Sequence, residues 1–189
     1  MMSQCRSTNT KRRRNPPLPR MSFQSPTGGA VMTLDHVPIE HKAEESTNMS
    51  EIIDGKLFLG DLGNATSLST SNPHNIKRVI TVGTGLEVGE AADGILYHRV
   101  EIEDDADADI NAAFTNANVT IHDCLQKDEP VLVHCKRGIS RSATIVIAYL
   151  AEHEIYPNLE ECQDEVAKKR PQIAPNLGFQ LWLQKKYSP

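Results

Sequence analysis

The chain has 189 residues, with 20 Lys and Arg against 25 Asp and Glu and a formal net charge of −5. This length fits one domain of ordinary size with some tail to spare. Every apolar run is much shorter than the roughly 20 residues that cross a bilayer, and polar and basic residues stand where a signal peptide has its apolar segment. The four cysteines are scattered, without the spacing of a zinc site. We expect a soluble intracellular protein with reduced thiols, in the cytoplasm, the nucleus or both.

The charge divides the chain into two parts. Residues 1–34 carry six basic residues, four prolines and no acid. A segment of this composition buries too little apolar surface to fold, so we expect residues 1–48 to form a disordered, basic, proline-containing tail. Residues 49–189 carry 13 Lys and Arg against 21 Asp and Glu, a net charge of −8. A folded domain this acidic is unsuited to binding nucleic acid.

The tail contains a basic cluster followed by apolar residues, "KRRRNPPLPRMSF", from Lys11 to Phe23. This order loosely resembles a docking motif for MAP kinases. A nuclear-import signal, or a solvated basic tail without a partner, remains an alternative for the same residues.

Beyond the tail, apolar runs alternate with helical patterns. The runs predict strands at 56–60, 78–83, 96–102 and 130–134, the last of them continuously apolar, as a strand covered on both faces would be. Apolar spacing and capping residues predict helices over 110–126, at about 141–152, from Asn158 to before Pro171, and from about Asn176. Strands interleaved with helices predict an α/β domain with a central, mostly parallel sheet flanked by helices.

The most informative stretch is "VLVHCKRGISRSATIVIAYL", from Val131 to Leu150. It places Cys135 at the carboxyl end of a buried strand, in a loop that leads into a helix. Such a loop favours anions, because the helix N-terminus offers unpaired N–H groups and the positive end of a dipole. Gly138 permits the turn that points amides inward, and the planar guanidinium of Arg141 can bind two oxygens of a tetrahedral anion. The same positive field would lower the pKa of Cys135 and make it a nucleophile.

The residues of this loop carry a family resemblance. The pattern His134-Cys135-x-x-Gly138-x-x-Arg141-Ser142 matches the signature loop of the cysteine-dependent protein phosphatases, and "GISRSATIVIAYL" resembles the dual-specificity branch.

Two further segments strengthen the resemblance. "IIDGKLFLGDLGNA", residues 52–65, looks like the family's opening strand, and "EVAKKRPQIAPNLGFQLWL", residues 165–183, looks like its carboxyl-terminal segment. Together the resemblance covers residues 50–187. It implies that residues 49–189 form a catalytic domain with a protein-tyrosine-phosphatase-like fold of the dual-specificity type.

The resemblance also implies roles for the reacting groups. Cys135 would attack phosphorus and carry a phosphocysteine, and Arg141 would bind the phosphate. An acid would protonate the leaving group and then act as a base. In the family's pattern it stands six positions before the first apolar residue of a helix, here Ile110, which selects Asp104 and leaves Asp105 as the alternative.

Other residues would support this chemistry. Ser142 would donate a hydrogen bond to the sulfur as the thiolate leaves, His134 would support the loop, and Asn176 would lie behind the site. The loop that would bind the phosphate consists of Cys135, Lys136, Arg137, Gly138, Ile139, Ser140 and Arg141. The resemblance implies that no metal or organic cofactor takes part.

The resemblance implies hydrolysis of phosphotyrosine, phosphoserine and phosphothreonine in proteins, with MAP kinases as candidate partners. Lys136 and Arg137 place two cations in the loop, which keeps a phosphoinositide or an RNA 5′-phosphate open as a substrate. A phosphoprotein-binding module with little turnover is a third hypothesis, although inactive relatives usually lack the cysteine or the arginine. The oligomeric state is not predicted.

Overall fold

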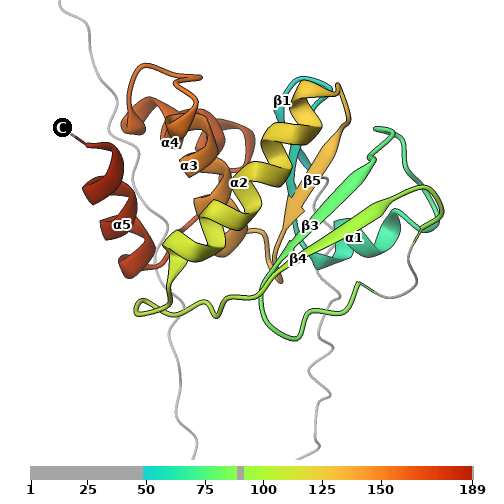
Figure 1. The fold of residues 1–189 in the computed structure, drawn as a ribbon, viewed down its shortest axis with the longest axis horizontal. Helices are drawn as coiled ribbons and strands as arrows, with labels where there is room; N and C mark the ends of the chain where they lie inside the picture. Colours follow the sequence, from blue (N-terminus) through green and yellow to red (C-terminus); the bar gives the residue numbers. More distant parts are fainter. Residues whose placement is uncertain (1–48, 89–91, 189) are drawn as a thin grey trace, which may run out of the picture. The chain divides into compact units, whose positions relative to one another are not determined.

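The computed structural model describes residues 49–88 and 92–188, so the predicted basic tail lies outside the described residues. The described part is built from a sheet and helices (Figure 1). In chain order these are β1 Ser50–Ile53, β2 Leu57–Gly60, α1 Leu62–Ser67, β3 Arg78–Val82, β4 Leu96–Val100, α2 Ile110–Gln126, β5 Val131–His134, α3 Arg141–Glu152, α4 Leu159–Lys169 and α5 Leu177–Tyr187. None of these helices has the length and apolarity needed to cross a membrane.

The five strands form one sheet in the order β1-β2-β5-β3-β4. The pair β1 and β2 is antiparallel, whereas β5 runs parallel to both β2 and β3, and β3 runs parallel to β4. The predicted central, mostly parallel sheet is therefore confirmed. Because β3, β4 and β5 are parallel, the loops that follow β4 and β5 lie at the same edge of the sheet, where they lead into α2 and α3 (Figure 1).

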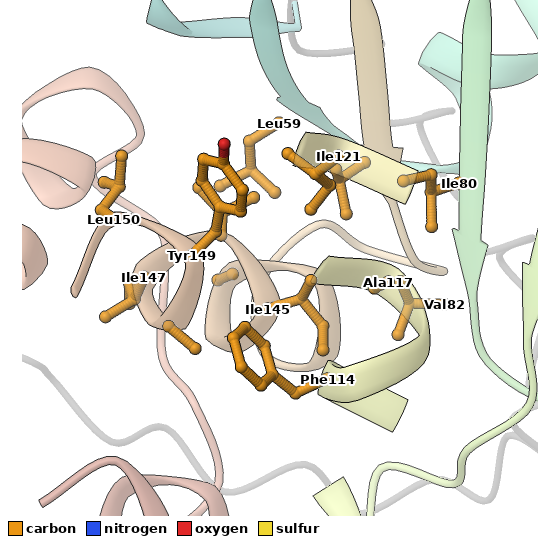
Figure 2. Close-up of a cluster of buried hydrophobic side chains, with 14 of the residues drawn as sticks. Leu59, Ile80, Val82, Phe114, Ala117, Ile121, Ile145, Ile147, Tyr149 and Leu150 are labelled. Atoms are coloured by element: carbon orange, nitrogen blue, oxygen red, sulfur yellow. The ribbon is translucent and has the colours of Figure 1, made fainter. Parts of the chain in front are cut away.

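The alternation of side chains along the strands divides the core between the two faces of the sheet. On one face, residues such as Leu59 and Val133 belong to a large cluster with side chains of α2, α3, α4 and α5. Figure 2 shows the centre of this cluster, where Phe114 and Ile121 lie near Ile145. On the other face, the smaller cluster contains Phe58, Val79, Leu132, Ala65, Leu68, Ile76, Val88 and Ile95. The central strand β5 is buried on both faces, as its continuous apolar sequence predicted.

The helix α3 follows β5 directly and is buried from Arg141 to Leu150. A helix that is buried all round is typical of the centre of a core. Its amino end is therefore held rigidly at the carboxyl edge of the sheet, where anions bind in α/β domains.

The predicted strands and helices are confirmed, with their ends shifted by two residues at most. Two short elements were not predicted: β1, and α1, which begins within the stretch 52–65 that resembled the family's opening strand. Helix α1 is six residues long and is capped by Asp61, the residue before it. The Asp61 carboxylate accepts a hydrogen bond from the Asn64 backbone amide, and the Asn64 side chain accepts one from the Asp61 backbone amide. This capping box uses Asn where Glu or Gln is usual, so the sequence pattern was easily missed.

Candidate active site

The loop from Cys135 to Ser140 joins β5 to α3. Its tightest point is Gly138, which has a φ of 64°. A Cβ atom at this position would lie 2.4 Å from the carbonyl oxygen of Gly60, so both the backbone conformation and the space require glycine. The turn directs the amides of the loop toward the sulfur of Cys135, and the Gly138 amide donates to it at 3.2 Å.

Two opposing effects act on the pKa of Cys135, which is 2% exposed. Burial raises the pKa of the thiol, but hydrogen bonds to the sulfur from the Ser142 hydroxyl, at 3.2 Å, and from the Ser142, Ile139 and Gly138 amides lower it more. The pKa of Cys135 is therefore below that of an ordinary cysteine. Burial raises the pKa of the other two described cysteines, Cys124 and Cys162. Of the three, Cys135 is the one prepared to react as a thiolate.

Arg141 is the first residue of α3, directly after this loop, and its side chain is only 10% exposed. Its Nη1 donates to the carbonyl oxygen of Ile102 at 3.4 Å. Its Nε has no hydrogen-bond partner among the described residues. A Cβ at Gly83 would come within 2.4 Å of Nη1, so glycine there leaves the space that the guanidinium fills. A buried, charged donor without a hydrogen-bond acceptor is suited to an anionic ligand.

Asp104 reaches the loop from the segment between β4 and α2. Its Oδ1 accepts hydrogen bonds from the Ser140 hydroxyl at 2.6 Å and from Nδ2 of Asn176 at 3.1 Å. Its Oδ2 lies 3.8 Å from Nε of Arg141. By contrast, the carboxylate of Asp105 accepts a hydrogen bond from the backbone of Asp107. The structure brings Asp104, and not Asp105, together with the cysteine loop.

These residues enclose a pocket of about 310 Å³. Its lining consists of Asp104, Cys135, Lys136, Arg137, Ile139, Ser140 and Arg141. Apart from Gly138, which turns the backbone, every residue of the predicted phosphate-binding loop lines it. The pocket thus combines a thiol, a carboxylate and three cationic side chains.

His134 and Thr81 hold the loop from behind. Nδ1 of His134 lies 3.3 Å from the carbonyl oxygen of Cys135, and Nε2 lies 2.8 Å from the Thr81 hydroxyl. A carbonyl can only accept, so Nδ1 carries the proton and Nε2 accepts from Thr81. Burial lowers the pKa of His134 to about 4, which keeps the ring neutral. His134 thus contacts the loop that it was predicted to support. Nothing in the sequence indicated that Thr81 would be its second partner.

Arg170 is a second supporting residue, and sequence reasoning assigned it no place. It is 1% exposed, and its Nε and Nη2 donate to the carbonyl oxygens of Gly138 and Arg137 at 2.8 and 3.4 Å. Its Nη2 also lies 3.6 Å from Oδ2 of Asp61. In the sequence, Arg170 stands directly before Pro171, in the segment that resembles the carboxyl-terminal part of the family. Its contact with a loop about 30 residues earlier could not be predicted from that pattern.

Asn176 does not line the pocket, but it contacts two residues that do, Asp104 and Ser140. Its Oδ1 accepts from the Phe179 amide and caps α5, and its own amide donates to the Ser140 hydroxyl at 3.1 Å. Nδ2 of Asn176 donates to Asp104, so the side chain and backbone of this one residue together link α5, the cysteine loop and the acid.

Comparisons with known proteins agree with this geometry. Residues 57–188 match the family model described as the catalytic domain of dual specificity phosphatases. Dual specificity protein phosphatase 1B of Arabidopsis thaliana is 33% identical over 141 residues, which cover 75% of this chain and 83% of that protein. The crystal structure of human DUSP28 superposes with a TM-score of 0.67 at 27% identity, over 74% of this chain and 92% of that one. A human tyrosine phosphatase-like serine/threonine/tyrosine-interacting protein superposes with a TM-score of 0.66 at 31% identity, over 74% and 95%.

The family match covers more than half of the chain and includes the whole pocket. The solved neighbours share the mixed α/β architecture with a mostly parallel sheet. The chain therefore belongs to the dual specificity phosphatase family and is a protein phosphatase enzyme of that family.

Proposed function

We propose that this protein hydrolyses phosphotyrosine, phosphoserine and phosphothreonine in proteins through a phosphocysteine formed on Cys135. The observation that carries the proposal is the pocket that is lined by a thiol of lowered pKa, the Arg141 side chain and the Asp104 carboxyl. A nucleophile, an anion-binding group and an acid are the three elements that phosphate ester cleavage requires.

In the first step, the thiolate of Cys135 attacks phosphorus and the bond to the ester oxygen breaks. Arg141 and the amides of the loop bind the phosphoryl oxygens and stabilise their charge. Asp104 protonates the departing oxygen. Its Oδ1 already accepts two hydrogen bonds, which leaves Oδ2 as the oxygen that can pass a proton to the leaving group.

In the second step, the carboxylate of Asp104 takes a proton from a water molecule, which attacks phosphorus while the sulfur–phosphorus bond breaks. Inorganic phosphate forms and the thiolate returns. The Ser142 hydroxyl and the loop amides stabilise the thiolate as it leaves, by the same hydrogen bonds that lower its pKa.

The assignment of the acid has a matched pair of variants. We expect Asp104→Asn to slow hydrolysis of phenyl phosphate by about 100-fold or more, because a poor leaving group needs the proton. Asp105→Asn, which removes the same charge from the next residue, should stay within about twofold of wild type. A large loss in Asp105→Asn with little in Asp104→Asn would shift the assignment by one residue.

The substrate class is supported by the relatives, which are named as protein phosphatases and include a MAP kinase phosphatase with leucine-rich repeats of Dictyostelium discoideum. Lys136 and Arg137 are exposed in the loop and line the pocket, so a more anionic substrate is the alternative. Turnover of a phosphopeptide, a phosphoinositide and a 5′-phosphorylated RNA, measured side by side, separates these classes. Faster turnover of the lipid or the RNA would overturn the protein assignment, and lack of turnover of all three would indicate a binding module.

A further inference from the structure

Arg170 contacts the cysteine loop but does not line the phosphate pocket. It follows α4 directly and is 1% exposed. A Cβ atom at Gly138 would lie 2.5 Å from its Nη2, so the guanidinium packs directly against the backbone of the loop. Burying a guanidinium costs free energy unless its N–H groups are hydrogen-bonded, so the acceptors of those bonds show what the side chain holds.

Two of its hydrogen bonds go to consecutive peptide groups of the loop. Nε of Arg170 donates to the carbonyl oxygen of Gly138 at 2.8 Å, and Nη2 donates to that of Arg137 at 3.4 Å. Both peptide groups are trans, so the N–H of each points away from its carbonyl oxygen. These N–H groups belong to Gly138 and Ile139, and both donate to the sulfur of Cys135, the first of them at 3.2 Å. Arg170 therefore binds the outer ends of the same two peptide groups whose inner ends donate to the sulfur.

The guanidinium is anchored to β1 and to the start of α1. Nη1 of Arg170 donates to the Ser50 hydroxyl at 3.5 Å, and Nη2 lies 3.6 Å from Oδ2 of Asp61, which caps α1. The first amide of α1, that of Leu62, donates to the carbonyl oxygen of Lys136 at 3.3 Å. Three successive peptide groups of the loop are thus held by their carbonyl oxygens, two of them by Arg170.

We propose that Arg170 is a positioning residue of the active site, which holds the peptide groups of the cysteine loop with their N–H groups directed at the sulfur and at the bound phosphate. The inference rests on the proposed function, because Arg170 acts through the loop amides that this function uses. Donors fixed in advance stabilise an anion without reorganising as its charge develops. Without the guanidinium, two carbonyl oxygens lose their donors, and rotation of their peptide groups turns the N–H groups away from the anion.

The variant Arg170→Lys separates the geometry of the guanidinium from its charge. An ammonium group keeps the positive charge near Asp61 but lacks the planar pair of donors formed by Nε and Nη2. We expect the pKa of Cys135 to rise by about one unit and the Kd for inorganic phosphate to rise about tenfold. Both values come from the rate at which iodoacetate alkylates Cys135, followed by peptide mass spectrometry against pH and against phosphate concentration at constant ionic strength.

Lys169→Met is the matched control. Nζ of Lys169 donates to the carbonyl oxygen of Ile52 in β1 at 2.9 Å. The control thus removes a cation and a hydrogen bond to a backbone carbonyl from the neighbouring residue, but outside the loop. It should keep the wild-type pKa of Cys135 and the wild-type Kd for phosphate, even if urea unfolding shows a loss of stability.

The inference predicts a shift in both values that is specific to position 170. Arg170→Gln, which has no guanidinium, should shift both in the same direction and is the variant to use if Arg170→Lys does not fold. Wild-type values in a folded Arg170 variant, or equal shifts in Lys169→Met, would overturn the inference. Hydrolysis of an aryl phosphate by wild type is measured in parallel. Failure there would overturn the proposed function, whereas the alkylation of Cys135 tests the positioning role without turnover.

Discussion

The ionisation of one thiol depends on a few hydrogen bonds. Burial alone would raise the pKa of Cys135, as it does for Cys124 and Cys162. The pKa of Cys135 is lowered because hydrogen-bond donors surround its sulfur, and the Ser142 hydroxyl lowers it most.

We therefore expect Ser142→Ala to raise the pKa of Cys135 by about one to two units, since a hydrogen bond to a charged group contributes about 1.5–3 kcal/mol. The pH dependence of inactivation by iodoacetate reports this pKa. Ser140→Ala removes a hydroxyl from the same loop, but one that donates to Asp104, so its thiol titration should match wild type. If the midpoint of the inactivation profile is unchanged in Ser142→Ala, the backbone amides of the loop alone lower the pKa of Cys135.

For single residues, the sequence identified the members of the site better than the contacts between them. The spacing of Cys135, Gly138 and Arg141 identified the anion loop because these residues are close in the chain. Counting from Ile110 selected Asp104, which the structure brings to the pocket. The hydrogen bonds that hold Asp104 could not be predicted, because Ser140 and Asn176 are 36 and 72 residues away from it.

Among the elements, α5 sets the position of the acid loop. A Cβ atom at Gly178, in the first turn of α5, would lie 1.9 Å from the carbonyl oxygen of Ala106. The backbone of α5 at Gly178 is therefore in close contact with the backbone of the β4–α2 loop at Ala106. Ala106 is two residues from Asp104, and Gly178 is two residues from Asn176.

Gly178→Ala should push these segments apart and displace the general acid. We expect kcat for phenyl phosphate to fall about tenfold, with a smaller loss for p-nitrophenyl phosphate, whose leaving group needs less protonation. Leu177→Ala changes the neighbouring position, which is 66% exposed, and should leave both rates near wild type. Equal losses for the two substrates in Gly178→Ala would argue against displacement of the acid.

The predictability of the elements followed their length and periodicity. Helix α2 matches its predicted range at both ends, because six buried side chains repeat along its 17 residues. By contrast, β1 is as long as β5, but its sequence SEII lacks the continuous apolar run that predicted β5. Helix α1 has six residues, too few for a helical pattern to appear.

Across the whole molecule, stability is linked to the neutral form of His134. This ring joins β5 to β3 through Thr81 and holds the loop through the Cys135 carbonyl. Its pKa is lowered to about 4, so between about pH 6.5 and pH 4 the unfolded chain takes up a proton that the folded one does not. This favourable contribution to folding is fully present above pH 6.5 and is lost as the pH falls toward 4.

The linkage predicts that acidification from pH 7 to pH 5 removes about 2 kcal/mol of unfolding free energy through this residue. Urea unfolding of wild type and His134→Asn at both pH values measures it. The variant should be less stable at pH 7 but lose about 2 kcal/mol less than wild type on acidification. Equal losses in the two proteins would mean that His134 is not the titrating group.

The central claim is that phosphate passes from the substrate to the sulfur of Cys135. The most direct measurement is mass spectrometry of the protein quenched in acid during turnover of an aryl phosphate, followed by peptide mapping. We expect a phosphate adduct on the peptide that contains Cys135, and neither adduct nor turnover in Cys135→Ser. Full turnover by Cys135→Ser, or an adduct on another residue, would contradict the mechanism.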